Sequence, residues 1–285
     1  MADIIITCDS TADLPLELRE KYNIKVIPLG VTLGDTTYQD GVNITPDEIY
    51  AHHDKTGELP KTTAANVGDF IDFFTPIVEE GKTVIHFTLS SEMSSTYNNG
   101  LLAAADFENV HIIDGKNLST GIGLVVLAAA EMLQNGLSAE EIIEKSEELV
   151  KCSDASFVID NLEYLHKGGR CSAVAMLGAN LLKLKPCIDV TNGKMDVSKK
   201  YRGKYAEVLK QYVSERLADL SDIDNTRIFV THAGCKDEIV NAVVEQVKGF
   251  NYFKEVIISR AGCTISAHCG ADTLGILYIR KSPKA

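Results

Sequence analysis

The sequence predicts an α/β protein of two domains. The N-terminal domain has a mostly parallel sheet with flanking helices, and the C-terminal α/β domain has a mixed sheet. The length of 285 residues suits two ordinary domains. Strand-like and helical segments alternate up to about residue 151, and hairpin-like patterns follow, so we expect domains at 1–153 and 154–285. A content of 45% hydrophobic and 24% charged residues excludes a disordered chain.

Four short segments of the first half are nearly all apolar, which is typical of strands buried on both faces. They are Ile4–Cys8, Lys25–Leu29, Thr83–Thr88 and Val110–Asp114. Helix-start signals lie between and after them, namely prolines at positions 15 and 46 and a capping box at Ser138–Glu141. This repetition of strand and helix predicts a parallel sheet with helices on its faces.

The second half has a different pattern. A helix of small residues is expected over 172–182, and two strands separated by Asn192-Gly193 predict a hairpin. A helix ending near position 247 follows the fourth of the strand segments. The expected strands are Ser156–Ile159, Lys185–Val190, Lys194–Ser198, Arg227–Thr231, Glu255–Ile258 and Leu274–Ile279. Hairpin and crossover connections together predict a mixed sheet.

Charge and cysteine usage narrow the function classes. The net charge of −12 disfavours general binding to nucleic acid. The longest apolar stretch, 121–132, is too short to span a bilayer, and no basic region precedes the apolar N-terminal run. The seven cysteines form no CxxC pair, which argues against a thiolate zinc site or a disulfide framework. We therefore expect a cytoplasmic protein without stable membrane insertion, metal or cofactor.

One part of this acidic chain is basic. Positions 163–204 carry nine Lys or Arg and three Asp or Glu, a local excess of positive charge. Within this window, Gly168 and Gly169 precede Arg170 at the start of the expected helix, an arrangement that suits an anion. The alternative is a helix-entry turn with Arg170 at the surface.

Hydroxyl side chains gather at the ends of predicted strands. Pro60–Thr63 precedes a helix, and Ser90–Tyr97 follows a strand of the parallel sheet. Ligands bind at the carboxyl ends of such strands, and hydroxyl donors suit a carboxylate or a phosphate. Helix capping is the alternative for any single Ser or Thr. His268, in a small-residue segment, is either a headgroup ligand or a core histidine.

Seven segments in order resemble the DegV family of fatty-acid-binding proteins over essentially the full length. The resemblance implies a two-domain α/β protein that holds a long-chain fatty acid in a tunnel between the domains. The matching segments are Cys8–Pro15, Tyr38–Gly41, Pro60–Thr63, Leu89–Tyr97, Tyr164–Arg170, Leu184–Pro186 and Ala267–Gly270.

The resemblance also implies roles for single residues. The carboxylate is expected on the hydroxyls of Thr62 and Ser94, with Thr63 and Ser95 beside them and Arg170 and His268 near the headgroup. Ser95 stands where the family usually has glycine. The expected function is to carry a palmitate-like fatty acid for lipid transport or fatty-acid metabolism. The expected partner is a dihydroxyacetone-kinase-like fatty-acid kinase that receives the carboxylate.

Two alternatives belong to other function classes. The first is a Ser/His-dependent esterase or acyl hydrolase with Ser94 or Ser90 as nucleophile and His268 as base. The absence of a GxSxG motif argues against it. The second is a sugar- or phosphate-binding module that uses Arg170 and the adjacent glycines. The preferred hypothesis is a noncatalytic lipid carrier.

Overall fold

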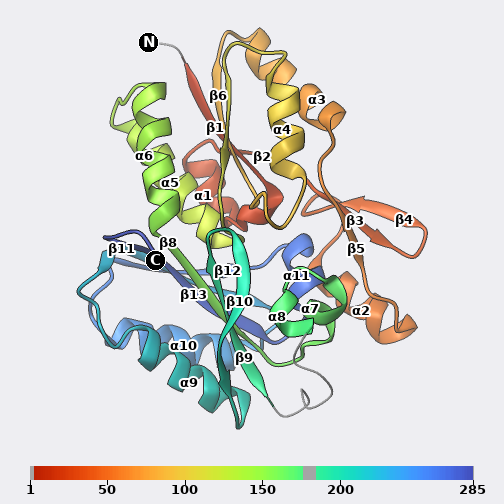
Figure 1. Ribbon diagram of the computed structural model, residues 1–285, viewed down its shortest axis with the longest axis vertical. Coiled ribbons are helices and arrows are strands. Elements are labelled where there is room, and N and C mark those ends of the chain that lie inside the picture. The colour runs from red at the N-terminus through yellow and green to blue at the C-terminus, as the bar shows by residue number, and fades with distance from the viewer. Residues whose placement is uncertain (1–2, 176–183, 285) are drawn as a thin grey trace.

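The structure is a computed structural model that describes residues 3–175 and 184–284. Figure 1 shows two layered blocks, one around a four-stranded sheet near the N-terminus and the other around a six-stranded sheet. A small three-stranded sheet lies at the side, between the two blocks. The predicted fold class is confirmed, because the first large sheet is parallel and the second is mixed.

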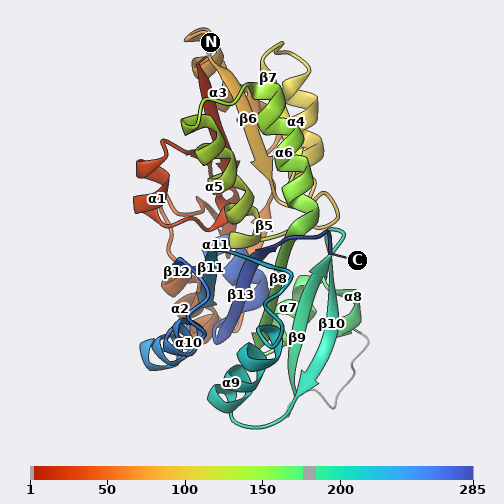
Figure 2. The same cartoon turned by 90° about the vertical axis from the view of Figure 1, so that its left-hand side faces the viewer.

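The four-stranded sheet contains the four strands that the apolar segments predict. Its order is β2-β1-β6-β7, and all its pairs are parallel. The strands are β1 (Ile4–Asp9), β2 (Lys25–Ile27), β6 (Thr83–Thr88) and β7 (Val110–Asp114). Their carboxyl ends share the edge that faces the six-stranded sheet, as Figure 2 shows. The loops after β1 and β6 therefore meet at the junction of the two blocks.

Alternate residues of β1 pack against helices on opposite faces of this sheet. Ile5 contacts the cluster formed by Phe70 and Phe74 of α3 (Val67–Glu79), with α4 (Thr96–Ala104) beside it. Ile4 and Ile6 face the other cluster, which includes α5 (Thr120–Gln134) and α6 (Ala139–Cys152). The predicted capping box is present at the start of α6. Burial on both faces explains why the strands are apolar throughout.

The six-stranded sheet has the order β10-β9-β8-β13-β11-β12. β11 and β12 are parallel and the other neighbours antiparallel. At the turn of the predicted hairpin, Asn192 and Gly193 both have positive φ angles, 50° and 81°, as a tight primed turn requires. The strands are β8 (Ser153–Ile159), β9 (Lys185–Thr191), β10 (Lys194–Tyr201), β11 (Ile223–Ala233), β12 (Glu255–Arg260) and β13 (Thr273–Arg280).

Helices α9 (Tyr205–Arg216) and α10 (Asp237–Gly249) cover the outer face of this sheet. Its inner face packs on α5, where ten of fifteen residues are buried because the helix lies between the two sheets. The helix expected over 172–182 is described only as α8 (Ser172–Ala175), and the rest of that prediction lies outside the described residues. Because the main core joins both halves of the chain, the boundary at 153 and the tunnel between domains stay predictions.

The three-stranded sheet was not anticipated from the sequence. It has the order β4-β3-β5 and consists of β3 (Gly30–Leu33), β4 (Thr36–Gln39) and β5 (Lys61–Thr63). The segment before the expected helix is thus a strand, paired in antiparallel register with β3. Short helices complete the fold around it, namely η1 (Ser10–Ala12), α1 (Leu16–Lys21), α2 (Pro46–Thr56), α7 (Glu163–Gly168) and α11 (Cys263–Cys269).

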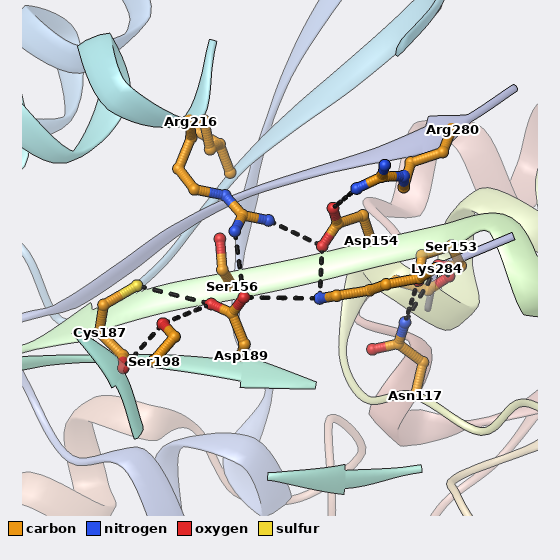
Figure 3. A network of polar contacts seen from close by, with 12 residues as sticks. Asn117, Ser153, Asp154, Ser156, Cys187, Asp189, Ser198, Arg216, Arg280 and Lys284 are labelled. Carbon is orange, nitrogen blue, oxygen red and sulfur yellow. Dashed lines mark hydrogen bonds and ion pairs between the residues drawn. The ribbon is translucent and has the colours of Figure 1, made fainter. Parts of the chain in front are cut away.

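A buried ion-pair network stabilises the six-stranded sheet near the C-terminus. Figure 3 shows the carboxylate of Asp154 surrounded by the cationic side chains of Arg216, Arg280 and Lys284. Asp154 is 1% exposed, and its Oδ1 lies 2.8 Å from Arg216 Nη2 and 2.7 Å from Lys284 Nζ. Although burial opposes ionisation, these cations lower the pKa of Asp154 below its usual value. The network fixes the last residues of the chain to β8.

Candidate ligand-binding site

A cavity of about 280 Å³ lies between the loop after β6, the strand β5 and the helix α11. One part of its wall is polar and includes the six residues that the sequence predicts for the headgroup: Thr62, Thr63, Ser94, Ser95, Arg170 and His268. The other part is apolar and includes Leu29, Leu89, Met93, Leu118, Met195 and Ile265. Thr62 and His268, which are 206 positions apart in the chain, are therefore brought together in one amphipathic cavity.

Four separate parts of the fold place these six polar residues. Thr62 and Thr63 lie on β5, Ser94 and Ser95 in the loop between β6 and α4, and His268 on α11. Arg170 follows α7. The position of Ser94 agrees with the expectation that ligands bind at the carboxyl ends of parallel strands. Thr62 instead owes its position to the three-stranded sheet, which pairs it with Val31.

Thr62 and His268 form the centre of the polar wall. Thr62 Oγ1 and His268 Nε2 are hydrogen-bonded at 2.8 Å. Burial of the imidazole, together with the nearby positive charge of Arg170, lowers the pKa of His268 to about 4. The ring is therefore neutral at physiological pH, so one nitrogen donates a hydrogen bond and the other accepts one. Nδ1 is buried and has no partner among the described residues.

The Gly168-Gly169 pair permits close packing against His268. A Cβ atom on Gly168 would lie 2.7 Å from His268 Nδ1, so no other residue fits there without displacing the ring. Gly169 ends α7 with a φ angle of 71°, in the left-handed region that favours glycine. Arg170 is exposed at the mouth of the cavity and donates from Nη1 to the Gly168 carbonyl at 2.7 Å. The side chain of Arg170 is therefore at the surface, as the hypothesis of a helix-entry turn predicts. It also lines the cavity, as the hypothesis of an anion-binding residue predicts.

Three serines that the sequence hypotheses name, Ser90, Ser94 and Ser95, lie in the loop between β6 and α4. Ser90 is buried, and its Oγ donates to the Gly193 carbonyl of the β9–β10 turn at 2.8 Å. Ser94 Oγ lies 2.8 Å from Thr96 Oγ1 at the start of α4, and Ser95 is exposed without a side-chain capping bond. The esterase hypothesis is not supported, since His268 is hydrogen-bonded to Thr62 and Ser90 to a carbonyl.

The apolar lining escaped the sequence reasoning. Met93 and Ile265 lie near Ser94 and His268 in the chain, at one and three positions before them. Their closeness in the sequence to two predicted ligand-binding residues could have indicated that they line the same cavity. Leu118 and Met195 come from distant segments, and nothing local distinguishes them from ordinary core residues.

Two further observations concern residues 3–175 and 184–284. Within these ranges, no three His, Cys, Asp or Glu side chains gather as a metal site requires. No helix described there has the length and apolar character needed to cross a bilayer.

Comparison with known proteins gives the chain its family. The model of the DegV family, described as uncharacterised proteins, matches residues 3–281. A fatty acid-binding protein of Thermotoga maritima is 34% identical over 277 residues, 95% of each chain. A fatty-acid-binding DegV family protein of Thermus thermophilus has a solved structure that superimposes with a TM-score of 0.90 at 30% identity, over 98% of this chain and 99% of that one. A stearic acid-binding protein of Eubacterium ventriosum, 28% identical, gives a TM-score of 0.83 over 99% of both chains. The chain therefore belongs to the DegV family.

Proposed function

We propose that this protein binds one long-chain fatty acid in the cavity and carries it for lipid transport or fatty-acid metabolism. The observation that carries the proposal is the division of the cavity wall into a hydroxyl and imidazole end and an apolar end. A fatty acid has the same division, with one charged carboxylate and a long hydrocarbon chain. The fatty-acid binding of family members of similar sequence supports this choice.

The apolar end supplies the driving force for binding. Burying roughly fifteen methylenes at about 0.8 kcal/mol each gives a gross gain on the order of 12 kcal/mol. Association and ordering of the chain cost several kcal/mol of this gain. Tight binding of a palmitate-like acid therefore requires a mostly dry pocket and a headgroup that keeps its hydrogen bonds.

The polar end can meet that requirement. A carboxylate without partners in a dry pocket is strongly unfavourable. Hydroxyls of Thr62, Thr63, Ser94 and Ser95 can each donate one hydrogen bond. When the neutral ring of His268 donates from Nε2 to Thr62 Oγ1, the Thr62 hydroxyl is free to donate to the carboxylate. Several neutral donors of this kind hold a negative charge without a buried cation. Arg170 stays at the mouth, where its charge favours an anion but remains hydrated.

An open groove beside the cavity supports presentation of the carboxylate to a second protein. This groove, of about 850 Å³, shares Thr62, Arg170 and His268 with the cavity and adds Lys61 and Lys167 to its lining. In the proposed reaction, a dihydroxyacetone-kinase-like enzyme brings ATP to the headgroup. A carboxylate oxygen attacks the γ-phosphorus, the bond to the bridging oxygen breaks, and ADP leaves. The three basic residues of the groove, Lys61, Lys167 and Arg170, outnumber its two acidic residues, Asp35 and Glu58, which favours an approaching phosphate.

Mass spectrometry of the small molecule released on denaturation tests fatty-acid binding directly. We expect one long-chain fatty acid per protein molecule, and delipidated protein should rebind palmitate. Release of no lipid, together with no rebinding, contradicts the proposal. Presentation is tested separately by adding the kinase and ATP and trapping acyl phosphate with hydroxylamine. A carrier that binds palmitate but yields no hydroxamate keeps the first part of the proposal and loses the second.

A further inference from the structure

Two acidic residues of the N-terminal half bind the start of the helix that carries His268. Asp13 Oδ1 accepts from the Gly262 amide at 2.8 Å. Asp40 Oδ1 accepts from the Cys263 amide at 2.7 Å, and its Oδ2 accepts from the Thr264 amide at 3.0 Å. The two carboxyl groups are 7% and 3% exposed. They belong to the segments Cys8–Pro15 and Tyr38–Gly41, which do not line the cavity described above.

These bonds replace the cap that α11 lacks. Its N-cap residue is Gly262, which has no side chain to accept from the first amides. Unpaired amides at a buried helix start are costly, and acidic groups are favoured there by the helix dipole. α11 therefore takes its N-terminal acceptors from residues more than 200 positions earlier in the chain.

Other hydrogen bonds hold the two carboxyl groups in place. Ser10 Oγ donates to Asp40 Oδ2 at 3.0 Å and accepts from the Leu29 amide at 3.1 Å. Ser119 Oγ donates to Asp13 Oδ2. Ser10 directly follows β1 of the four-stranded sheet. The carboxylate of Asp40 is thus fixed relative to that sheet.

The orientation of α11 decides which side chains face the cavity. Thr264, Ile265, His268 and Cys269 all line it. A helix of seven residues is too short to be stable alone, so its position depends on its partners. Because each residue turns the helix by about 100°, a slip of one residue would turn His268 away from Thr62.

We propose that Asp13 and Asp40 are positioning residues of the headgroup site, which hold α11 so that His268 meets Thr62. The proposal rests on the function proposed above for the effect on lipid binding, but the placement of His268 can be measured without any ligand. Asp40→Asn is the main test, because the amide keeps one acceptor and sets an NH₂ group against the Thr264 amide and the Ser10 hydroxyl. Asp69→Asn is the matched control, since Asp69 accepts from the Asn66 amide at the start of α3, outside the cavity.

The first readout is the titration of His268 in ligand-free protein, followed by NMR of labelled imidazole carbons and assigned with His268→Gln. In the wild type, burial lowers the pKa of His268 to about 4. We expect Asp40→Asn to raise it toward the ordinary value of 6.5, because a displaced ring gains water. The second readout is palmitate affinity, which we expect to weaken by about tenfold, the equivalent of one modest hydrogen bond. Asp69→Asn should change neither.

A purely structural role predicts a different result. If Asp40→Asn lowers the urea midpoint but leaves the His268 titration unchanged, the proposal is overturned. If the variant does not fold, Ser10→Ala decides, because it removes one bond to Asp40, and it should move the His268 titration in the same direction by less. No movement in a folded Ser10→Ala overturns the proposal in that case. A moved titration in a protein that binds no fatty acid supports the positioning role and contradicts only the proposed function.

Discussion

Replacing Thr62 with valine tests the headgroup assignment most directly. Valine keeps the shape of the half-buried side chain and removes only the hydroxyl, so the packing of β5 should survive. A hydrogen bond to a charged group contributes about 1.5–3 kcal/mol, so losing the proposed bond to the carboxylate weakens binding by roughly 10- to 150-fold. The 2.8 Å bond to His268 is lost in both free and bound protein, and its loss largely cancels from the affinity.

Loss of the Thr62–His268 hydrogen bond should instead lower the free energy of unfolding. A neutral hydrogen bond contributes about 0.5–1.5 kcal/mol net, and a donor or acceptor left unpaired adds to the cost, so Thr62→Val should unfold at a lower urea concentration. Isothermal titration with palmitate gives the affinity, and urea unfolding gives the stability. Thr75→Val is the matched control, because Thr75 Oγ1 donates to the Ile71 carbonyl in α3, away from the cavity. If Thr62→Val binds palmitate as tightly as Thr75→Val, the headgroup does not lie on Thr62.

Three further predictions concern other parts of the molecule. Arg170→Ala should reduce acyl-phosphate formation by the kinase more than palmitate affinity, because the exposed guanidinium acts mainly when phosphate arrives; an equal loss of both would make Arg170 a primary ligand. Gly168→Ala should displace His268 and weaken palmitate binding by about tenfold or more while the protein stays folded, whereas unchanged affinity would show that the ring position is unimportant. Asp154→Asn should lower the free energy of unfolding by about 2 kcal/mol, because Arg216, Arg280 and Lys284 each lose one of their two acidic partners and keep only Asp189 or Asp222. Since the cations lower the pKa of folded Asp154, its contribution exists above the unfolded pKa and disappears as the pH falls through the folded pKa, so wild type and variant should converge in acid urea titrations. A constant difference down to acid pH would contradict that assignment.

The local patterns predicted the elements with the strongest periodicity. The four apolar segments became the parallel sheet, and Asn192-Gly193 became the hairpin turn, because burial and turn geometry act over a few residues. The strand at Lys61–Thr63 was missed because three polar residues have no strand pattern of their own. Its structure comes from pairing with Gly30–Leu33, a contact that short-range reasoning does not detect.

The sequence by itself predicted the fold class and, through resemblance to a known family, six headgroup residues that the structure places in the wall of one cavity. Only the tertiary structure decided the contacts around them. Thr62 is hydrogen-bonded to His268, Ser90 donates to the Gly193 carbonyl, and Gly168 leaves room for the His268 ring. The tertiary structure also showed that Asp40 caps a helix far along the chain. The physical reason is that secondary structure follows from local periodicity, whereas a buried polar group can be satisfied only by whatever partner the whole fold brings within about 3 Å.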